Sequence, residues 1–342
     1  MFRLAPANIR EYPLRMSRHP APSSPDEGRP RVGISSCLLG EAVRYDGGHK
    51  RDRFITDVLG ACVEFVPMCP ELEVGMGVPR PSVRLEGSIS EPRLVEPKGG
   101  TDWTERMHAY SRKRLRLLGP LNLSGFILKK DSPTCGMERV RVYPEGGGQA
   151  DRHGRGLFAA ALIEAMPLLP VEEEGRLNDP ALRENFIERV FAYHRWHRFN
   201  SEPKSRGRLV AFHAAHKLLI LAHSETHLRR LGRVVATAKG RPLAEVYASY
   251  GTLFMQGLAA RATRRQHTNV LQHIMGHFSD HLEPRERAEL LAEIDDHRRG
   301  LVPLLVPLTL VRHYVRKFEV PYIQNQVYLN PHPKELLLRN HV

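Results

Sequence analysis

Three short apolar runs, each followed by a cysteine, constrain the fold of this chain more than any other feature of its sequence. The runs are RVGISS (31–36), CVEFVPM (62–68) and LSGFILKK (123–130), and the cysteines that follow them are Cys37, Cys69 and Cys135. Apolar, β-branched runs of this length are typical of buried strands. In an open parallel sheet the carboxyl ends of the strands meet at one edge, where ligands bind. The sequence therefore predicts that three thiols converge on one crevice.

Helical segments are predicted between and after these strands. The helix signals cover 51–60, 102–118 and 154–166, and a further strand is predicted in RVRVYP, 139–144. Gly119 and Pro120 end the second helix, and Pro167 ends the third. Strands that alternate with helices predict an α/β domain with a mostly parallel sheet, which we place at residues 31–172.

The chain beyond the polar stretch 168–185 has a different pattern. Its apolar residues recur at helical spacing with no strand signal, so we expect an all-α helical domain at residues 181–342. Residues 1–30 contain six prolines and no apolar core of a secretory signal. They are interpreted as a flexible arm or as an over-extended start. With four cysteines and no signal, the expected location is the cytoplasm, and no membrane partner is expected.

Positive charge is concentrated in the helical half. The chain has 51 Lys and Arg against 38 Asp and Glu; residues 181–342 contain 25 and 14 of these, which leaves 26 and 24 for residues 1–180. A basic excess confined to one domain indicates a polyanionic partner such as nucleic acid, although a solvated basic face would give the same count. Arg195, Trp196, His197, Arg198 and Phe199 interleave cations with aromatic rings, as surfaces that bind RNA do, or else pack in a core.

The three strand-end cysteines leave several kinds of chemistry open. No closely spaced cysteine pair is present, so a closed four-cysteine zinc site is not indicated. Three thiolates with an open fourth position suit an iron–sulfur cluster with one free iron or an open zinc site, and three unrelated buried cysteines remain an alternative. Cys62 stands at the opposite end of its strand, so we expect a buried structural thiol there.

Three motifs around these cysteines resemble the thiouracil desulfidase family. They are SSCLLGEAVRYDGG (35–48), PMCPELEVGMGVPRP (67–81) and KKDSPTCG (129–136). The resemblance covers residues 31 to about 170 and implies a Rossmann-like fold with a 4Fe-4S cluster. Cys37, Cys69 and Cys135 would be its ligands, and the one open iron would take the sulfur of a thiolated pyrimidine.

The same resemblance assigns further site residues. Glu71 matches the catalytic acidic residue of the family and Ser132 its active-site serine, while Arg44, Tyr45 and Asp46 would line the substrate pocket. Without the resemblance, Glu71 is equally a solvated loop carboxylate. The segments that hold Ser132 and Asp46 are also plausible turns, on composition alone.

The helical half resembles an uncharacterised domain fused behind the desulfidase domain, with the tail YLNPHPKELLLRNHV (328–342) as one carrier of the likeness. The fused form resembles a tRNA 4-thiouridine desulfidase, which implies that tRNA is the partner of the helical half. The sequence therefore predicts an iron–sulfur-dependent enzyme that converts 4-thiouridine in tRNA into uridine and sulfide. The alternatives are a desulfidase of free thiouracil or thiouridine and a non-catalytic RNA-binding metal protein.

Overall fold

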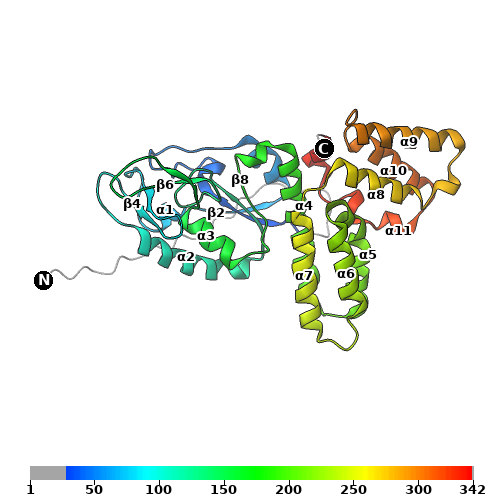
Figure 1. Cartoon of the computed structure of the whole chain (residues 1–342), viewed down its shortest axis with the longest axis horizontal. Coiled ribbons are helices and arrows are strands. Elements are labelled where there is room, and N and C mark those ends of the chain that lie inside the picture. Colours follow the sequence, from blue (N-terminus) through cyan, green and yellow to red (C-terminus); the bar gives the residue numbers. More distant parts are fainter. Residues whose placement is uncertain (1–27, 341–342) are drawn as a thin grey trace. The chain divides into compact units, whose positions relative to one another are not determined.

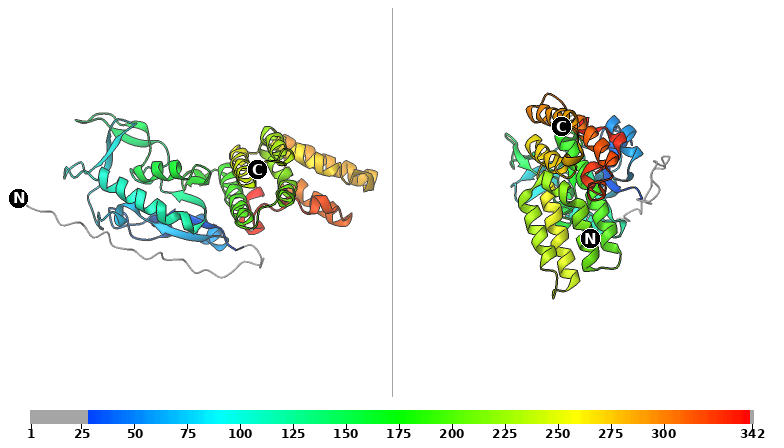
Figure 2. Two further views of the ribbon diagram at one scale, coloured as in Figure 1. Left: turned by 90° about the horizontal axis from the view of Figure 1, so that it is seen from below. Right: turned by 90° about the vertical axis from the view of Figure 1, so that its right-hand side faces the viewer.

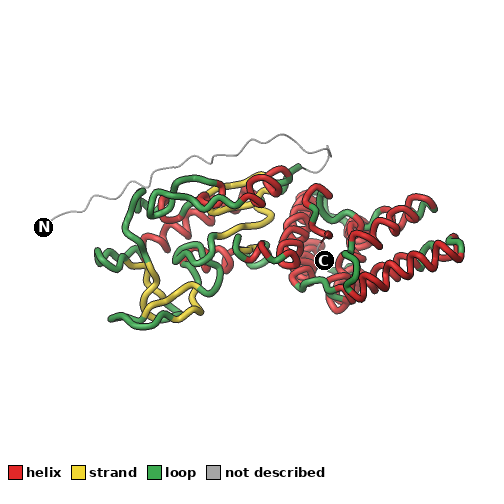
Figure 3. The backbone as a smooth tube through the Cα atoms, turned by 90° about the horizontal axis from the view of Figure 1, so that it is seen from above, coloured by secondary structure: helices red, strands yellow, loops and turns green. Residues whose placement is uncertain are grey.

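Residues 28–340 are described by the computed structural model, and the chain divides into two compact units, Met1–Leu177 and Asn178–Val342 (Figure 1). Within the described residues, every strand belongs to the first unit and the second is helical (Figure 3). The expected fold class is therefore confirmed. The predicted N-terminal arm lies outside the described residues, apart from 28–30.

A four-stranded parallel sheet forms the centre of the first unit. Its order is β2-β1-β5-β8, and every neighbouring pair is parallel. The strands are β1 (Arg31–Ser35), β2 (Glu64–Met68), β5 (Leu123–Leu128) and β8 (Val171–Glu173). Ile34 of β1 pairs with Pro67 on one side and with Ile127 on the other, so the three strands end at the same level. The three strands that precede the cysteines were thus predicted correctly.

A second, mixed sheet was not foreseen. The strand predicted at 139–144 is real, but it lies in this sheet instead of extending the parallel one. The sheet has the order β4-β3-β6-β7 and consists of β3 (Arg84–Gly87), β4 (Pro92–Val95), β6 (Val140–Tyr143) and β7 (Asp151–Gly154). The fourth parallel strand is β8, whose short sequence VEE has no apolar signal. Its buried carboxylates are satisfied locally, because Glu172 accepts from Arg176 at 2.6 Å and Glu173 from the backbone N–H of Met137 at 2.6 Å.

Three helices accompany the sheets of the first unit: α1 (Pro70–Glu73), α2 (Thr104–Leu118) and α3 (Leu157–Ala165). Figure 2 shows α2 and α3 side by side over the parallel strands. Phe158 of α3 packs between Phe126 of β5 and Tyr110 of α2, with ring centroids 6.0 and 6.1 Å apart. The helix predicted at 51–60 is a π-helical turn, Phe54–Val58, followed by a 3₁₀ turn, Leu59–Ala61.

The second unit is built from helices α4 to α11. Their bounds are α4 (Pro180–Ser201), α5 (Arg206–His223), α6 (Glu225–Ala236), α7 (Leu243–Ala259), α8 (Arg264–Met275), α9 (Pro284–Arg299), α10 (Leu305–Lys317) and α11 (Pro321–Gln324). Figure 1 shows α4 to α7 as one bundle, and α8, α9 and α10 pack on one another. Capping side chains begin several helices, as Asp179 does for α4 by accepting from the backbone N–H of Ala181 at 2.9 Å. None of the described helices has the length and apolar character that a membrane crossing requires.

An aromatic cluster fills the core of this bundle. Trp196 is only 6% exposed, with its ring 5.4 Å from Tyr250 and 5.3 Å from Phe212. Phe199 stacks on Phe212 at 4.6 Å and on Tyr247 at 5.4 Å. Of the two interpretations left open for Trp196, stacking on RNA and packing in a core, the structure shows core packing, because the large apolar ring is buried among other rings. Arg195 lies next to it and donates to the backbone carbonyl of Pro331 at 2.9 Å.

Close packing between β1 and β5 makes Gly33 a sensitive position. A Cβ atom on Gly33 would lie 2.3 Å from Cδ2 of Phe126, whose side chain is fully buried. We expect Gly33→Ala to lower the free energy of unfolding of the α/β unit by about 1–3 kcal/mol, which is the usual effect of overpacking a core. Hydrogen exchange of the β1 and β5 amides in the full chain measures this loss.

Gly28→Ala is the matched control, because nothing lies within 4 Å of the added Cβ there. Its exchange rates should equal those of the wild-type chain. Unchanged exchange in Gly33→Ala would show that the ring of Phe126 moves aside without loss of packing.

Candidate functional site

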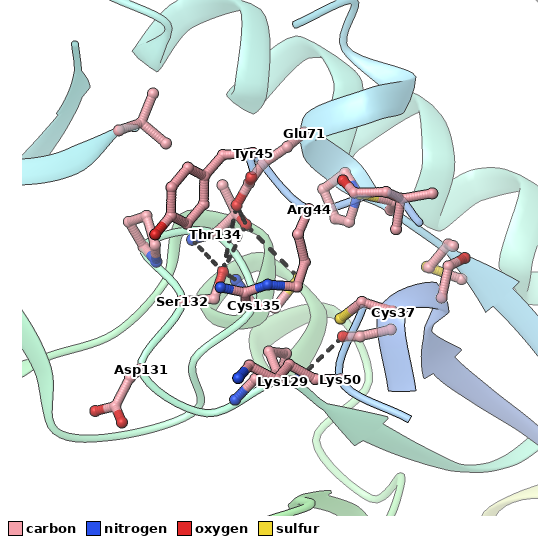
Figure 4. Close-up of a pocket in the computed structure, with 18 of the residues that line it drawn as sticks. Cys37, Arg44, Tyr45, Lys50, Glu71, Lys129, Asp131, Ser132, Thr134 and Cys135 are labelled. Atoms are coloured by element: carbon pink, nitrogen blue, oxygen red, sulfur yellow. Dashed lines mark hydrogen bonds between the residues drawn. The ribbon is translucent and has the colours of Figure 1, made fainter. Parts of the chain in front are cut away.

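The three predicted cysteines lie at the carboxyl ends of three neighbouring strands. Cys37 sits in a 3₁₀ turn directly after β1, and Cys69 follows β2 and precedes Pro70, the first residue of α1. Cys135 lies in the loop after β5. All three line one cavity of about 360 Å³. Figure 4 shows Cys37 and Cys135 in its wall. The three thiols therefore converge on one cavity, as the strand pattern predicts.

Burial keeps these thiols protonated in the absence of a cation. Cys37 is 8% and Cys135 6% exposed, and neither they nor Cys69 form a disulfide. Burial raises the pKa of each of the three thiols to about 12. Negative charge on neighbouring groups contributes to this rise, chiefly from Cys69 at Cys37 and from Glu71 at Cys69 and Cys135. Three thiolates can therefore coexist here only with positive charge among them.

The distances between the three thiols bear on whether they could bind a single metal ion or an iron–sulfur cluster. A single zinc ion about 2.3 Å from each sulfur would hold the sulfurs about 3.8 Å apart. Within residues 28–340, however, these three ligand atoms do not all lie within 4.8 Å of one another. An iron–sulfur cluster holds its cysteines farther apart, because several irons and sulfides lie between them. At the distances in this structure, the three thiols would have to move closer together to bind a single ion.

Cys62 is separate from this set, in line with its expected structural role. It follows the 3₁₀ turn Leu59–Ala61 and precedes β2, and it is 4% exposed. It is not among the residues that line the cavity. Its position at the amino end of β2 is the opposite end of the strand from Cys69.

Glu71 points into the cavity from the first turn of α1 and is held by several partners (Figure 4). Its Oε1 accepts from the hydroxyl of Thr134 at 2.7 Å and from that of Ser132 at 3.4 Å. Its Oε2 forms a salt bridge with Arg80. Arg80 also donates to the backbone carbonyls of Val43, at 3.0 Å, and Gly77, at 2.8 Å. One guanidinium thus fixes the carboxylate and two loops of the cavity wall.

Ser132 has both a turn role and a place in the cavity. Its hydroxyl oxygen accepts from the backbone N–H of Cys135 at 3.1 Å and of Thr134 at 3.3 Å, which is turn chemistry. The same oxygen lies 2.9 Å from the hydroxyl of Thr134. Thr134, which is fully buried, also lies 3.6 Å from the sulfur of Cys135. The loop therefore joins Glu71, two hydroxyls and a thiol in one network.

The segment Arg44–Tyr45–Asp46 divides between the cavity and a turn. Arg44 and Tyr45 line the cavity, and the ring of Tyr45 is 45% exposed at its mouth. Asp46 does not line it. The carboxylate of Asp46 accepts from the backbone N–H of Gly48 at 3.0 Å and lies 3.4 Å from Nε of Arg44. The structure thus places Asp46 as a turn residue that orients Arg44.

Lysines add positive charge to the cavity wall. Lys50, Lys129 and Lys130 all line it. Lys129 is engaged by Glu174 at 2.5 Å and by the carbonyl of Lys130 at 3.0 Å. Its backbone N–H donates to the hydroxyl of Ser35 at 3.0 Å. Lys50 and Lys130 are exposed, and their positive charge favours an anionic group at the cavity.

Several residues of this site were not predicted from the sequence. Arg80 and Thr134 stand inside the motifs that carry the cysteines, yet nothing in the spacing shows that they meet at Glu71. Glu73 was also missed: it accepts from the backbone N–H of Cys69 at 3.1 Å and from the hydroxyl of Tyr110 at 2.9 Å, and Arg114 lies 3.3 Å away. Burial raises the pKa of Glu73, which the positive charge of Arg114 partly counteracts. This trio fixes the backbone of Cys69 from the side of α2.

The fold and the cavity define an α/β protein whose parallel sheet presents three thiols and a carboxylate to one small pocket. Comparison with known proteins gives the family. The model of the 2-thiouracil desulfurase family matches residues 32–174, and that of a protein family of unknown function, DUF1722, matches residues 217–333. The chain belongs to the 2-thiouracil desulfurase family, with a DUF1722 domain fused behind it. The resemblance seen in the motifs is thereby confirmed.

Two bacterial relatives each match a part of the chain. The uncharacterised protein YbgA of Escherichia coli (strain K12) is 37% identical over 153 residues, which are 44% of this chain and 90% of that protein. The uncharacterised protein YbbK of Bacillus subtilis (strain 168) is 32% identical over 151 residues, 43% of this chain and 97% of that protein. Among solved structures, the [4Fe-4S]-dependent thiouracil desulfidase TudS is 30% identical, covers 46% of this chain and 98% of its own, and has a TM-score of 0.38.

The buried pair of Glu71 and Arg80 should contribute to stability as well as to the geometry of the site. We expect Arg80→Ala to destabilise the α/β unit by about 3–5 kcal/mol, because it leaves a half-buried carboxylate without its counter-charge. Arg44→Ala is the control, since its partner Asp46 is exposed and such pairs contribute only about 0–1 kcal/mol. Hydrogen exchange of the parallel-sheet amides in the full chain gives both values. Equal effects of the two substitutions would contradict the prediction.

Proposed function

We propose that this chain is an iron–sulfur-dependent desulfidase that removes sulfur from a thiolated uracil, and that its substrate is 4-thiouridine in tRNA. The observation that carries the proposal is the meeting of Cys37, Cys69 and Cys135 with Glu71 in one cavity. Membership of the 2-thiouracil desulfurase family supports the same activity. The products would be uridine and sulfide, with the oxygen supplied by water.

The three strand-end cysteines would hold the cluster. Their burial makes an uncompensated thiolate unfavourable, which supports a cationic group such as a cluster as the occupant of the cavity. Such a cluster, with one iron left open by a three-cysteine set, would supply a Lewis acid that takes up negative charge from the departing sulfur. The backbone of Cys69 is already oriented by Glu73.

Glu71 would serve as the general base. Replacement of sulfur by oxygen requires a water molecule to attack the ring carbon and to lose its protons. The carboxylate of Glu71 lies in the cavity wall, fixed by Arg80 and by Thr134, so its orientation is set before the substrate binds. The hydroxyls of Ser132 and Thr134, 2.9 Å apart, would pass a proton along or donate to the ring of the base.

The charge of the helical unit supports an RNA substrate. The exposed arginines of this unit include Arg229, Arg230 and Arg233 on α6, and Arg261, Arg264 and Arg265 at and before the start of α8. Arginines on a surface bind the phosphate backbone irrespective of sequence. The thiolated base would have to leave its stack in the tRNA to enter the cavity, where Tyr45 offers an exposed ring at the mouth.

An activity assay on two substrates tests the proposal. The full chain, reconstituted anaerobically with its cluster, is mixed separately with thiolated tRNA and with free 4-thiouracil. We expect the absorbance of the thiolated base to disappear on tRNA, with one sulfide released per base. Loss on the free base alone would support a free-base desulfidase instead. No loss on either substrate, despite a full cluster, would leave only a non-catalytic RNA-binding protein.

A cluster held by three cysteines predicts which thiols retain iron. Cys37→Ala, Cys69→Ala and Cys135→Ala should each lose most of the iron of the reconstituted chain, because each removes one ligand. Cys62→Ala is the matched control and should keep it, since its thiol lies outside the cavity. Iron and sulfide analysis with the visible spectrum measures this. The same loss in all four variants would overturn the ligand assignment.

The basic surface predicts a selective loss of tRNA binding. In the described part of the chain, no carboxylate lies within 4.0 Å of Arg264 or Arg265, and both are exposed. We expect the double variant Arg264→Ala, Arg265→Ala to bind thiolated tRNA more weakly. The slope of log K against log salt should become shallower by up to about 0.9 for each phosphate group that the variant no longer neutralises. Turnover of free 4-thiouracil should not change.

Arg298 and Arg299 provide the control for this pair. They are also exposed, but Asp295 lies 2.6 Å from Arg298 and Asp296 lies 3.7 Å from Arg299. Their replacement by alanine should leave the salt dependence of tRNA binding nearly unchanged. Unaltered binding in the Arg264, Arg265 variant would remove these two residues from the RNA-binding surface.

A further inference from the structure

The helical unit contains a second group of potential metal ligands, far in sequence from the cysteines. Glu184 and Glu188 lie one turn apart on α4, and His332 lies in the C-terminal segment. One ligand atom from each of the three lies within 4.8 Å of the other two. Within residues 28–340, this is the one group of three or more such residues that meets this distance.

Two of the three residues bury polar atoms that have no hydrogen-bond partner. Glu184 is 4% exposed, and neither of its carboxylate oxygens accepts a hydrogen bond. Nε2 of His332 is likewise buried and without a partner. A buried polar atom that is left unsatisfied is destabilising by about 1–3 kcal/mol, so three of them in one place indicate that something is to be bound there.

The contacts of His332 determine which atom carries the lone pair. Its Nδ1 lies 3.1 Å from the backbone carbonyl oxygen of Pro333, which can only accept. Nδ1 therefore carries the hydrogen, and Nε2 presents a lone pair to the two carboxylates. A neutral imidazole with a free nitrogen is the form that binds metal ions.

Glu188 is held in place by its other neighbours. Its Oε2 lies 3.0 Å from Nε2 of His223, and its Oε1 accepts from Arg339 at 3.0 Å. Both carboxyl oxygens of Glu188 therefore accept a hydrogen bond, which fixes the orientation of the group. A fixed carboxylate next to a free lone pair is a pre-oriented ligand.

Arg339 does not satisfy Glu184. Its Nε lies 3.5 Å from Oε1 of Glu184 and has no hydrogen-bond partner. Burial and the neighbouring charge of Glu188 make an uncompensated carboxylate unfavourable at this position. Glu184 has no hydrogen-bond partner for either carboxyl oxygen, so both oxygens are free to bind a cation.

We propose that Glu184, Glu188 and His332 bind one divalent transition-metal ion of the zinc class. An ion about 2.0–2.2 Å from nitrogen and oxygen ligands separates those ligands by about 3–4 Å, within the limit that the three residues satisfy. The mixed nitrogen and oxygen set suits zinc or a neighbouring first-row metal. The ion would join α4 to the C-terminal segment and so stabilise the helical unit. A proton on Glu184 is the rival occupant.

Zinc binding to the full chain tests this proposal. The chain is first loaded with its iron–sulfur cluster, so that the cysteines are occupied, and is then equilibrated with Zn²⁺ and dialysed. We expect one zinc per chain by elemental analysis, with only nitrogen and oxygen neighbours in its X-ray absorption spectrum. Zinc should also raise the unfolding temperature, because it binds the folded unit alone.

Substitution of the ligands gives the second measurement. Glu184→Gln and His332→Gln should weaken zinc binding at least tenfold and remove the rise in unfolding temperature. Glu225→Gln and His273→Gln change exposed residues of the same types on α6 and α8, and should do neither. Glu184→Gln is an isosteric change, and we expect it to leave the unit folded because the new amide can donate to His332.

Three results would overturn the proposal: no retained zinc, sulfur neighbours around the zinc, or the same affinity in the ligand and control variants. The first result would show that a proton occupies the site, and the second that the zinc lies at the cysteines. The absorption spectrum and the unfolding temperature of the wild-type chain decide between these outcomes even if a ligand variant fails to fold. Because iron at the cysteines is measured separately, the test is independent of the desulfidase activity.

Discussion

Parallel pairing of β1 with β2 and β5 is the constraint on which the site depends. Because Ile34 is level with both Pro67 and Ile127, the three strands end at one edge of the sheet. The segment that follows each strand contains one of the cysteines. Close contact between Gly33 and the ring of Phe126 fixes the distance between β1 and β5. A shift of one residue in either pairing would direct the side chains of β1 to the opposite faces of the sheet and would separate Cys37 from the other two thiols.

Electrostatics then decides what the cavity can hold. The two buried thiols, the half-buried thiol of Cys69 and the carboxylate of Glu71 all become costly when charged, and Arg80 forms its salt bridge with the carboxylate. A cationic cluster would allow the thiols to ionise without disturbing the pair of Glu71 and Arg80. The hydroxyls of Ser132 and Thr134 bridge these two parts of the site, because they contact both Glu71 and the loop of Cys135.

The helical unit separates its aromatic residues from its arginines. Trp196, Phe212 and Tyr250 pack inside the bundle, whereas the arginines of α6 and of the start of α8 are exposed. The buried charges of Glu188 and Arg339 lie elsewhere, between α4 and the C-terminal segment, and are hydrogen-bonded to each other. A surface for a polyanion and a buried polar cluster thus occupy different parts of one domain, and they can be tested independently.

Sequence alone determined the class of both units, the three central strands and the cysteines that follow them, because burial of β-branched runs and helical periodicity are local properties. Motifs that resemble a known family also pointed to Glu71 and Ser132, and the structure places both in the cavity wall. The second sheet, the strand β8 and the buried place of Trp196 came only from tertiary structure, since VEE and an Arg-Trp-His-Arg run have no apolar pattern of their own. The contacts of Arg80, Thr134 and Glu73 were likewise found only in the tertiary structure. Hydrogen bonds and ion pairs depend on distance in space, which the spacing of residues in the sequence does not encode.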